Sequence, residues 1–114
     1  MKITLKPLGN IANEIMEELR DRVGGIFHCP VEIKAGFSDL AQAYDPQRKQ
    51  YLSSKLLASL GKSEGEERVV GIVDVDLYVP RLNFVFGEAD MVSGTAIISP
   101  VSYTHLTLPT ILLV

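Results

Sequence analysis

The sequence predicts an α/β protein, in which a mostly parallel, twisted sheet is flanked by helices and carries an antiparallel edge strand late in the chain. Three features of the 114 residues support this class. Strand-like and helix-like segments alternate over the first part of the chain, residues 69–73 form a continuous apolar run, and two more strand-like segments follow. Alternating strands and helices build parallel sheets, and an apolar run suits a strand covered on both faces. We therefore expect the order β-α-β-α-β-β-β.

Two different periodicities predict the first strand and the first helix. Ile3 and Leu5 alternate with polar residues and lead into a turn at residues 7–9. Asn10 or Asn13 is the expected N-cap of the helix that follows, and residues 24–25, both glycine, are its expected end. Its apolar stripe has helical spacing and consists of Ile11, Ile15, Leu19 and Val23, with Met16 beside them.

A second strand is predicted at residues 31–34, followed by a surface loop over residues 35–44. Asp45 and Pro46 predict the start of a second helix, because Asp is a good N-cap and Pro suits the first helical position. The buried stripe of this helix is expected to be Leu52, Leu56, Leu57 and Leu60, with Gly61 ending it. The remaining strands are residues 69–73 in the middle of the sheet, then residues 83–88 and 95–98.

Composition excludes several classes of protein. Eleven basic and fourteen acidic side chains give a net charge of −3, and no window concentrates Lys and Arg, so we expect no nucleic-acid partner. The one cysteine, Cys29, leaves no intramolecular disulfide and fits the reducing cytoplasm. Because no apolar run approaches the roughly 20 residues of a membrane helix and the N-terminus lacks signal-peptide features, we expect a cytoplasmic protein with no membrane partner.

Two carboxylates, Asp74 and Asp76, follow the central apolar run and offer one catalytic hypothesis. An Asp-x-Asp pair at a strand end resembles the first motif of haloacid-dehalogenase-like phosphatases, in which the pair helps to hold magnesium and the first Asp attacks phosphorus. That motif normally lies near the start of its domain, and here it lies two thirds along the chain. The alternative is that both residues are caps of the strand end and its turn.

Two further segments are distinctive together. Residues 44–51 have the pattern Tyr-Asp-Pro-x-Arg-x-Gln-Tyr, and residues 74–89 contain Asp-Val-Asp-Leu-Tyr followed by Asn-Phe-Val-Phe-Gly-Glu-Ala. In order and spacing they resemble the archaemetzincins, a family of zinc metallopeptidases. The resemblance covers residues 1 to about 99.

The resemblance implies the upper subdomain of a metzincin, in which an antiparallel edge strand lines the cleft and pairs with an extended peptide or protein substrate. The matching strand consists of Asn83, Phe84, Val85, Phe86, Gly87 and Glu88. An edge strand has N–H and C=O groups that an extended peptide pairs with, and Phe84 and Phe86 on one face would anchor the strand to the core. The alternative is that another part of the chain covers this edge and no peptide pairs with it.

The sequence also departs from the family. Catalysis there needs zinc bound by His-Glu-x-x-His-x-x-Gly-x-x-His, and the 114 residues contain no His-Glu pair. The cysteines that the family uses for a second zinc are absent too, since Cys29 matches none of them. We therefore expect no catalytic and no metal-binding residue in this chain, which would be an inactive fragment of a zinc peptidase. A non-catalytic α/β binding module is the main alternative.

The last residues differ abruptly from the rest. Residues 101–114 carry no charged side chain, and residues 101–110 are similar to the translation of a common transposase sequencing adaptor. We therefore expect residues 1–100 to be the metzincin-like subdomain and residues 101–114 to be a non-native tail, in which His105 has no functional meaning. The alternative is that the tail forms a last buried strand.

Overall fold

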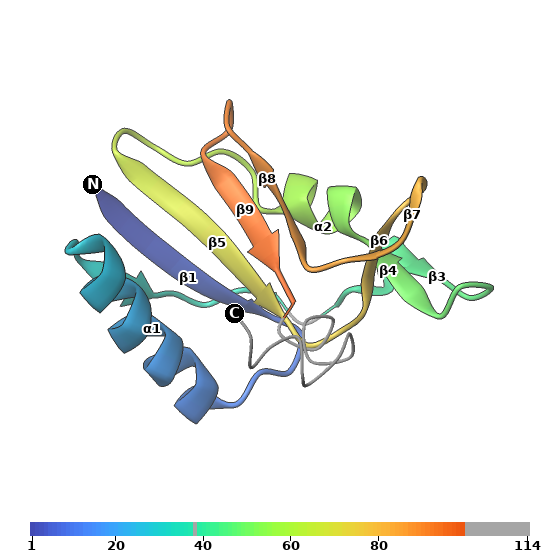
Figure 1. Ribbon diagram of the computed structural model, residues 1–114, viewed down its shortest axis with the longest axis horizontal. Coiled ribbons are helices and arrows are strands. Elements are labelled where there is room, and N and C mark those ends of the chain that lie inside the picture. The colour runs from blue at the N-terminus through green and yellow to red at the C-terminus, as the bar shows by residue number, and fades with distance from the viewer. Residues whose placement is uncertain (38, 100–114) are drawn as a thin grey trace.

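The computed structural model describes residues 1–37 and 39–99. Its main sheet has five strands in the order β2-β1-β5-β9-β8, of which β8 alone runs antiparallel, against β9 (Figure 1). The bounds of these strands are β1 (Lys2–Leu8), β2 (Val31–Ile33), β5 (Glu67–Val73), β8 (Gly87–Asp90) and β9 (Thr95–Ile98). The predicted α/β class, the central position of residues 69–73 and the antiparallel edge strand are confirmed.

Helix α1 (Asn13–Phe27) covers one face of this sheet. Met16, 2% exposed, packs with Ile3, Leu5 and Ile72, and Leu19 and Val23 lie against the same cluster. The predicted Asn caps are wrong, because Ala12 is the N-cap and makes no side-chain hydrogen bond. Ile15, expected in the buried stripe, is 47% exposed. The other predicted positions, Ile11, Leu19 and Val23, pack against this cluster together with Met16, so the predicted stripe is confirmed except at Ile15.

The predicted end of α1 at residues 24–25 is also wrong. The helix continues to Phe27 and stops at His28, which has a φ of 53° and donates its backbone N–H to the Gly24 carbonyl at 2.9 Å. Glycine costs a helix about 1 kcal/mol relative to alanine, which is small enough for tertiary packing to override. A side chain on Gly24 would contact Val31 of β2, so the last turn lies close against the sheet.

The second helix starts later than predicted, because residues 44–52 form a hairpin. Strands β3 (Tyr44–Asp45) and β4 (Gln50–Leu52) pair antiparallel, and α2 covers only Ser53–Ser59. The Asp45 carboxylate accepts the N–H groups of Gln47 and Arg48 at 2.9 and 3.3 Å, as an N-cap would. Lys49, with a φ of 54°, then reverses the chain. The Asp-Pro pair that predicted the start of a helix thus forms a turn instead.

A smaller sheet projects beside the main one (Figure 1) and has the order β3-β4-β6-β7. Its third and fourth strands are β6 (Leu77–Val79) and β7 (Leu82–Val85). A single 3-10 turn, η1 (Ala41–Ala43), leads into it. The largest buried cluster lies between this sheet, α2 and the second face of the main sheet, and includes Leu8, Leu57, Val73, Leu77 and Ile97.

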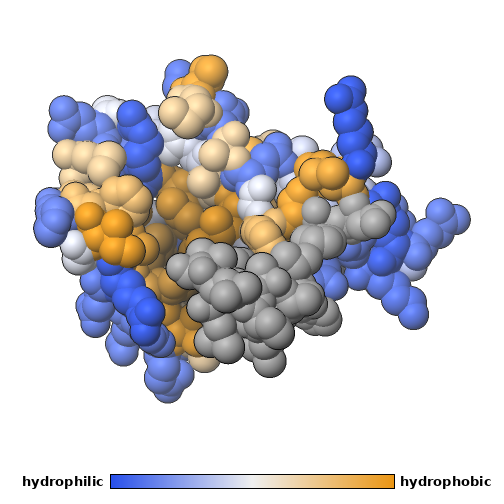
Figure 2. Space-filling view, viewed as in Figure 1, coloured by the Kyte–Doolittle hydropathy of each residue, from blue (hydrophilic) through white to orange (hydrophobic). Residues whose placement is uncertain are grey.

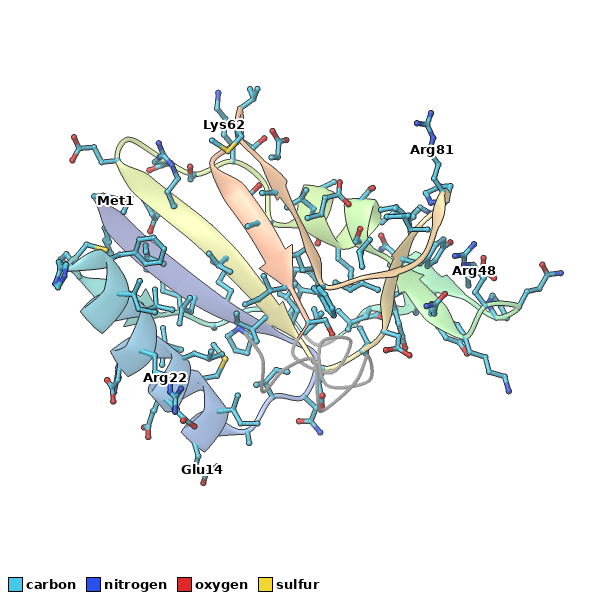
Figure 3. The ribbon with its side chains drawn as sticks, viewed as in Figure 1. Met1, Glu14, Arg22, Arg48, Lys62 and Arg81 are labelled. Carbon is cyan, nitrogen blue, oxygen red and sulfur yellow. The ribbon has the colours of Figure 1, made fainter. Side chains whose placement is uncertain are left out.

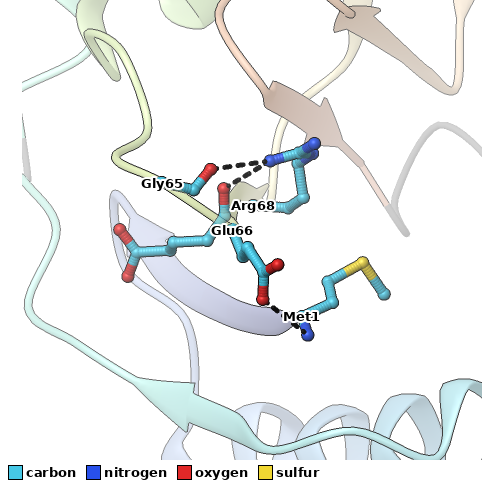
Figure 4. Close-up of polar contacts among 5 residues, drawn as sticks. Met1, Gly65, Glu66 and Arg68 are labelled. Carbon is cyan, nitrogen blue, oxygen red and sulfur yellow. Dashed lines mark hydrogen bonds and ion pairs between the residues drawn. The ribbon is translucent and has the colours of Figure 1, made fainter.

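Polar contacts tie the start of β1 to the turn before β5 (Figure 4). The N-terminal ammonium lies 3.6 Å from the Glu66 carboxylate, and the Arg68 guanidinium donates to the carbonyls of Gly65 and Glu67. Exposed contacts of this kind contribute little to stability. The buried hydroxyl of Thr4, which donates to the Glu67 carboxylate at 2.5 Å, is the more specific link between β1 and β5.

Candidate functional site

Strand β8 forms one edge of the main sheet, and no described strand pairs with its outer side. Ser99 donates its N–H to the Phe86 carbonyl at 2.7 Å, which makes that pair hydrogen-bonded. Since hydrogen-bonded and non-bonded pairs alternate along an antiparallel ladder, Gly87 opposite Ile98 and Ala89 opposite Ala96 are non-bonded pairs. The backbone N–H and C=O groups of Gly87 and Ala89 therefore point outward, where an extended chain could pair with them.

The predicted strand of residues 83–88 is not one strand. The chain bends at Phe86, so that β7 belongs to the small sheet and β8 to the main sheet. Phe86, expected to anchor the strand, is 37% exposed at this bend. Of the predicted edge residues, Gly87 and Glu88 lie in the edge strand of the main sheet, whereas Asn83, Phe84 and Val85 lie in β7.

Gly87 makes the bend possible by its lack of a side chain. A Cβ atom at this position would lie 2.3 Å from the Ile97 carbonyl oxygen, a distance that real Cβ atoms do not reach. The obstacle is backbone of the neighbouring strand, which cannot rotate out of the way. Glycine at residue 87 is therefore required for β8 to approach β9 directly after the bend.

Glu88 fixes the edge strand to α2. Its Oε1 atom accepts the hydroxyl of Ser53 at 2.5 Å and that of Ser54 at 3.1 Å. Ser53 is fully buried, so the first of these bonds is shielded from water. Hydrogen bonds to a charged acceptor are stronger than neutral ones, so this contact holds β8 in place beneath the helix.

Asp90 closes the turn between β8 and β9. Its carboxylate accepts the N–H groups of Val92 and Ser93 at 3.0 and 3.2 Å and the Ser93 hydroxyl at 2.9 Å. The backbone N–H of Ser93, followed by its hydroxyl, holds the pKa of Asp90 below its ordinary value. Hydrogen bonds that are made to the charged form favour that form, which is the cause of the shift.

Asp74 and Asp76, the candidate magnesium ligands, lie in the connection between β5 and β6. Asp74 is exposed, and Asp76 accepts the Tyr51 N–H through its backbone carbonyl at 2.8 Å. Residues 1–37 and 39–99 contain no group of three His, Cys, Asp or Glu side chains placed to hold a metal ion.

The two distinctive sequence segments meet in the small sheet, which sequence reasoning did not foresee. The guanidinium of Arg48, a residue labelled in Figure 3, lies 4.0 Å from the centre of the Tyr78 ring and donates to the Leu82 carbonyl at 2.8 Å. The Tyr78 hydroxyl donates to Asp45 at 3.3 Å, and burial, followed by the Asp45 charge, raises the pKa of Tyr78. These contacts join the β3–β4 turn to the β6–β7 hairpin.

The described residues leave part of the main sheet's face beside α1 uncovered. Between α1 and β9 it has a hollow of about 290 Å³, lined almost wholly by apolar side chains that include Phe27, Val70 and Ile98. Figure 2 shows apolar surface on this side of the molecule. Phe27 is 56% exposed and Ile98 39% exposed, so large apolar side chains here face solvent.

No helix among the described residues is long and apolar enough to cross a bilayer. No family model matches the chain. It is 36% identical over 99 residues to the archaemetzincin of Methanocaldococcus jannaschii, covering 87% of this chain and 54% of that protein. It is also 36% identical to the archaemetzincin of Methanopyrus kandleri, covering 81% of this chain and 51% of that protein. The chain thus spans about half the length of the curated relatives it matches.

Solved structures agree with these relatives. The crystal structure of an archaemetzincin from Archaeoglobus fulgidus matches with a TM-score of 0.78 and 29% identity, covering 98% of this chain and 67% of that one. A zinc-dependent peptidase of Methanocorpusculum labreanum matches with a TM-score of 0.74, covering 87% of this chain and 63% of that one. At 22% identity, the second match shows the fold alone.

Replacing Gly87 with alanine is expected to lower the free energy of unfolding by about 1 to 3 kcal/mol, because the new methyl group collides with the Ile97 carbonyl. Gly25→Ala is the matched control, since nothing lies within 4 Å of its added Cβ and the residue is helical. That control should stabilise the protein by up to about 1 kcal/mol. Urea unfolding measures both, and equal effects of the two variants would contradict the steric role of Gly87.

Acid is expected to weaken the β8–β9 turn through Asp90. Because the pKa of Asp90 is lower in the folded state, its stabilising contribution is present above its unfolded pKa of about 4 and is lost as the pH falls through the lower folded value. Asp90→Asn should therefore destabilise the protein at pH 6, and the difference from wild type should shrink towards pH 2. Urea midpoints at both pH values measure this, and a constant difference would refute it.

Proposed function

Because this chain is homologous to the archaemetzincins over about 99 of its residues, we propose that it is the substrate-strand part of a zinc-dependent metallopeptidase. In this proposal an extended peptide pairs with the outer edge of β8, and a zinc-activated water hydrolyses one of its peptide bonds. The outward backbone groups of Gly87 and Ala89 are the observation that carries the proposal.

The edge of β8 is built to stay in one position, which pairing with a peptide requires. Gly87 lets the strand approach β9 closely, Glu88 is bonded to Ser53 and Ser54, and Asp90 fixes the turn that follows. A preorganised edge loses little conformational entropy when a peptide binds to it. The bend at Phe86 ends the edge on one side, so the peptide would pair with residues 87–90.

Zinc chemistry in this proposal depends on residues other than those described. The described residues hold no cluster of metal-ligating side chains, and the 114 residues contain two histidines, His28 and His105. The zinc ligands would therefore belong to sequence outside the 114 residues, and the chain by itself would be inactive. The apolar hollow beside α1 supports this, since the part of the sheet that the described residues leave open suits packing against a further element.

The source DNA, sequenced outward from codon 83, decides first whether an intact protein of this kind exists. We expect the natural reading frame to continue past codon 100 into a His-Glu-x-x-His helix. The purified product of that frame should then cleave unstructured peptides, lose the activity to a chelator and regain it with zinc, whereas the 114-residue chain should cleave none. A frame that ends with codon 114 would favour the non-catalytic binding module instead.

The pairing edge is tested in that intact product by Ala89→Pro. Proline removes the outward N–H of residue 89 without removing a ladder bond to β9, because Ala89 lies in a non-bonded pair. We expect kcat/KM to fall about tenfold, the effect of losing one backbone hydrogen bond to the peptide. Ala89→Val keeps the N–H and should leave kcat/KM within about twofold. Equal effects of the two variants would contradict pairing at this edge.

A further inference from the structure

A second hollow, of about 500 Å³, lies between α2 and the β8–β9 hairpin, on the opposite face of the sheet from α1. Leu57 and Ala58 of α2 form an apolar part of its wall. Glu88, Asp90 and Thr95 form the polar part, on the sheet side. The register explains this grouping: Glu88 and Asp90 are two residues apart on β8, and Thr95 is the direct partner of Asp90.

Thr95 has an unmet hydrogen-bonding need in this hollow. Its side chain is 4% exposed, and its Oγ1 atom has no hydrogen-bond partner among the described residues. A buried hydroxyl left without a partner is unfavourable and rare. Thr4, equally buried on β1, shows the usual solution, because its hydroxyl donates to Glu67. Thr95 therefore resembles a group whose partner lies outside the described residues.

The charge of the hollow indicates what that partner carries. Glu88 and Asp90 are both acidic. Oε1 of Glu88 accepts the shorter bonds from Ser53 and Ser54, and Oε2 accepts a longer bond from Ser54 at 3.3 Å, which leaves a further lone pair on Oε2. The hydrogen bonds from Ser93 favour the charged form of Asp90. A group with several N–H donors and a positive charge satisfies the carboxylates and the Thr95 hydroxyl together.

A bare metal ion fits this hollow less well than an organic cation. The described residues contain no set of three acidic, His or Cys side chains around one point, and both oxygens of Asp90 already accept hydrogen bonds from Val92 or Ser93. The apolar wall at Leu57 and Ala58 would stay uncovered around an ion. A long aliphatic stem that ends in a cation covers that wall and reaches the carboxylates.

We propose that this hollow binds the side chain of a lysine or arginine in a peptide that lies along the outer edge of β8. The inference rests on the proposed function for the peptide's position, because residues opposite Glu88 or Asp90 on a paired strand have their side chains on the same face. It makes the intact enzyme selective for substrates with a basic residue at that position. Lys62, at the rim by the β8–β9 turn (Figure 3), competes with the incoming cation.

The subsite is tested without catalysis, on the 114-residue chain, by NMR titration. The probe is Nα-acetyl-lysine methylamide, and the control is the norleucine analogue, which has the same stem without the charge. The lysine probe is expected to shift the amide signals of Ser54, Asp90 and Thr95 saturably and to bind at least tenfold more tightly than norleucine. Equal binding of the two probes, or no shift at these residues, overturns the proposal.

Three variants separate binding from folding. Thr95→Val keeps the shape of the side chain, so it should weaken lysine binding about tenfold while leaving stability unchanged or higher, because no bond is lost. Thr4→Val, the matched control, should lower stability and leave the dissociation constant unchanged. Lys62→Met, at an exposed position, should tighten binding. Unchanged lysine affinity in both Thr95→Val and Lys62→Met overturns the proposal.

The outcomes for this subsite and for the peptidase are distinguishable. Saturable lysine binding with no activity in the intact product would leave the subsite standing and remove the peptidase function. Activity that depends on the N–H of residue 89 but is indifferent to a basic residue in the substrate would leave the peptidase function and remove the subsite.

Discussion

The whole fold depends on β5 being buried on both faces. Residues of this strand alternate between two cores: Ile72 faces α1 with Met16, and Val69 and Val73 face α2 with Leu57. Seven register pairs join β5 to β1 on one side and four join it to β9 on the other. Because each core needs the sheet as its floor, loss of this strand would leave both helices without a surface to pack on. A strand that is buried on both faces needs a continuous run of apolar residues, and β5 has such a run.

The edge strand β8 obeys the opposite constraint, since it must remain rigid although only β9 pairs with it within residues 1–37 and 39–99. A strand held on one side only is prone to fray or to pair with other chains. Here two contacts restrain β8 where a second paired strand would otherwise do so. Glu88 is hydrogen-bonded to Ser53 of α2, and Asp90 is hydrogen-bonded within the turn that follows. The two acidic side chains also place charge beside the exposed edge. They thereby favour a partner of specific chemistry over indiscriminate pairing with other strands.

The sequence was sufficient for those elements whose signal is local. Residues 69–73 were recognisable as a central strand because burial on both faces leaves a continuous apolar run. The first part of the second predicted helix was wrong because Asp45 followed by Pro46 favours an N-cap and an Asx turn alike. The choice between them came from β6, whose Leu77 pairs with Tyr51 from 26 residues further along the chain. A parallel partner at such a separation has no local signature.

The candidate site was predictable in part for the same reason. Similarity to a known family located the edge strand, but not the bend that divides residues 83–88 between two sheets. The bend rests on a contact between Gly87 and the Ile97 carbonyl, which a chain pattern does not contain. The bonds from Ser53 to Glu88 and from Tyr78 to Asp45 likewise join residues 35 and 33 positions apart. Strand periodicity predicts on which face of a sheet a side chain lies, whereas only tertiary packing brings the two bonded side chains into contact.

The pairing of β1 with β5 has a consequence for how the protein is made. Thr4 contacts Glu67 across 63 positions of sequence, so the first strand leaves the ribosome long before its central partner exists. At synthesis rates of about 5 to 20 residues per second, the delay is roughly 3 to 13 seconds. During that interval one edge of β1 is unpaired, although α1 and β2 can already form beside it. Nascent chains of this fold are therefore expected to engage chaperones early, and codons that slow translation before residue 67 would prolong the exposure.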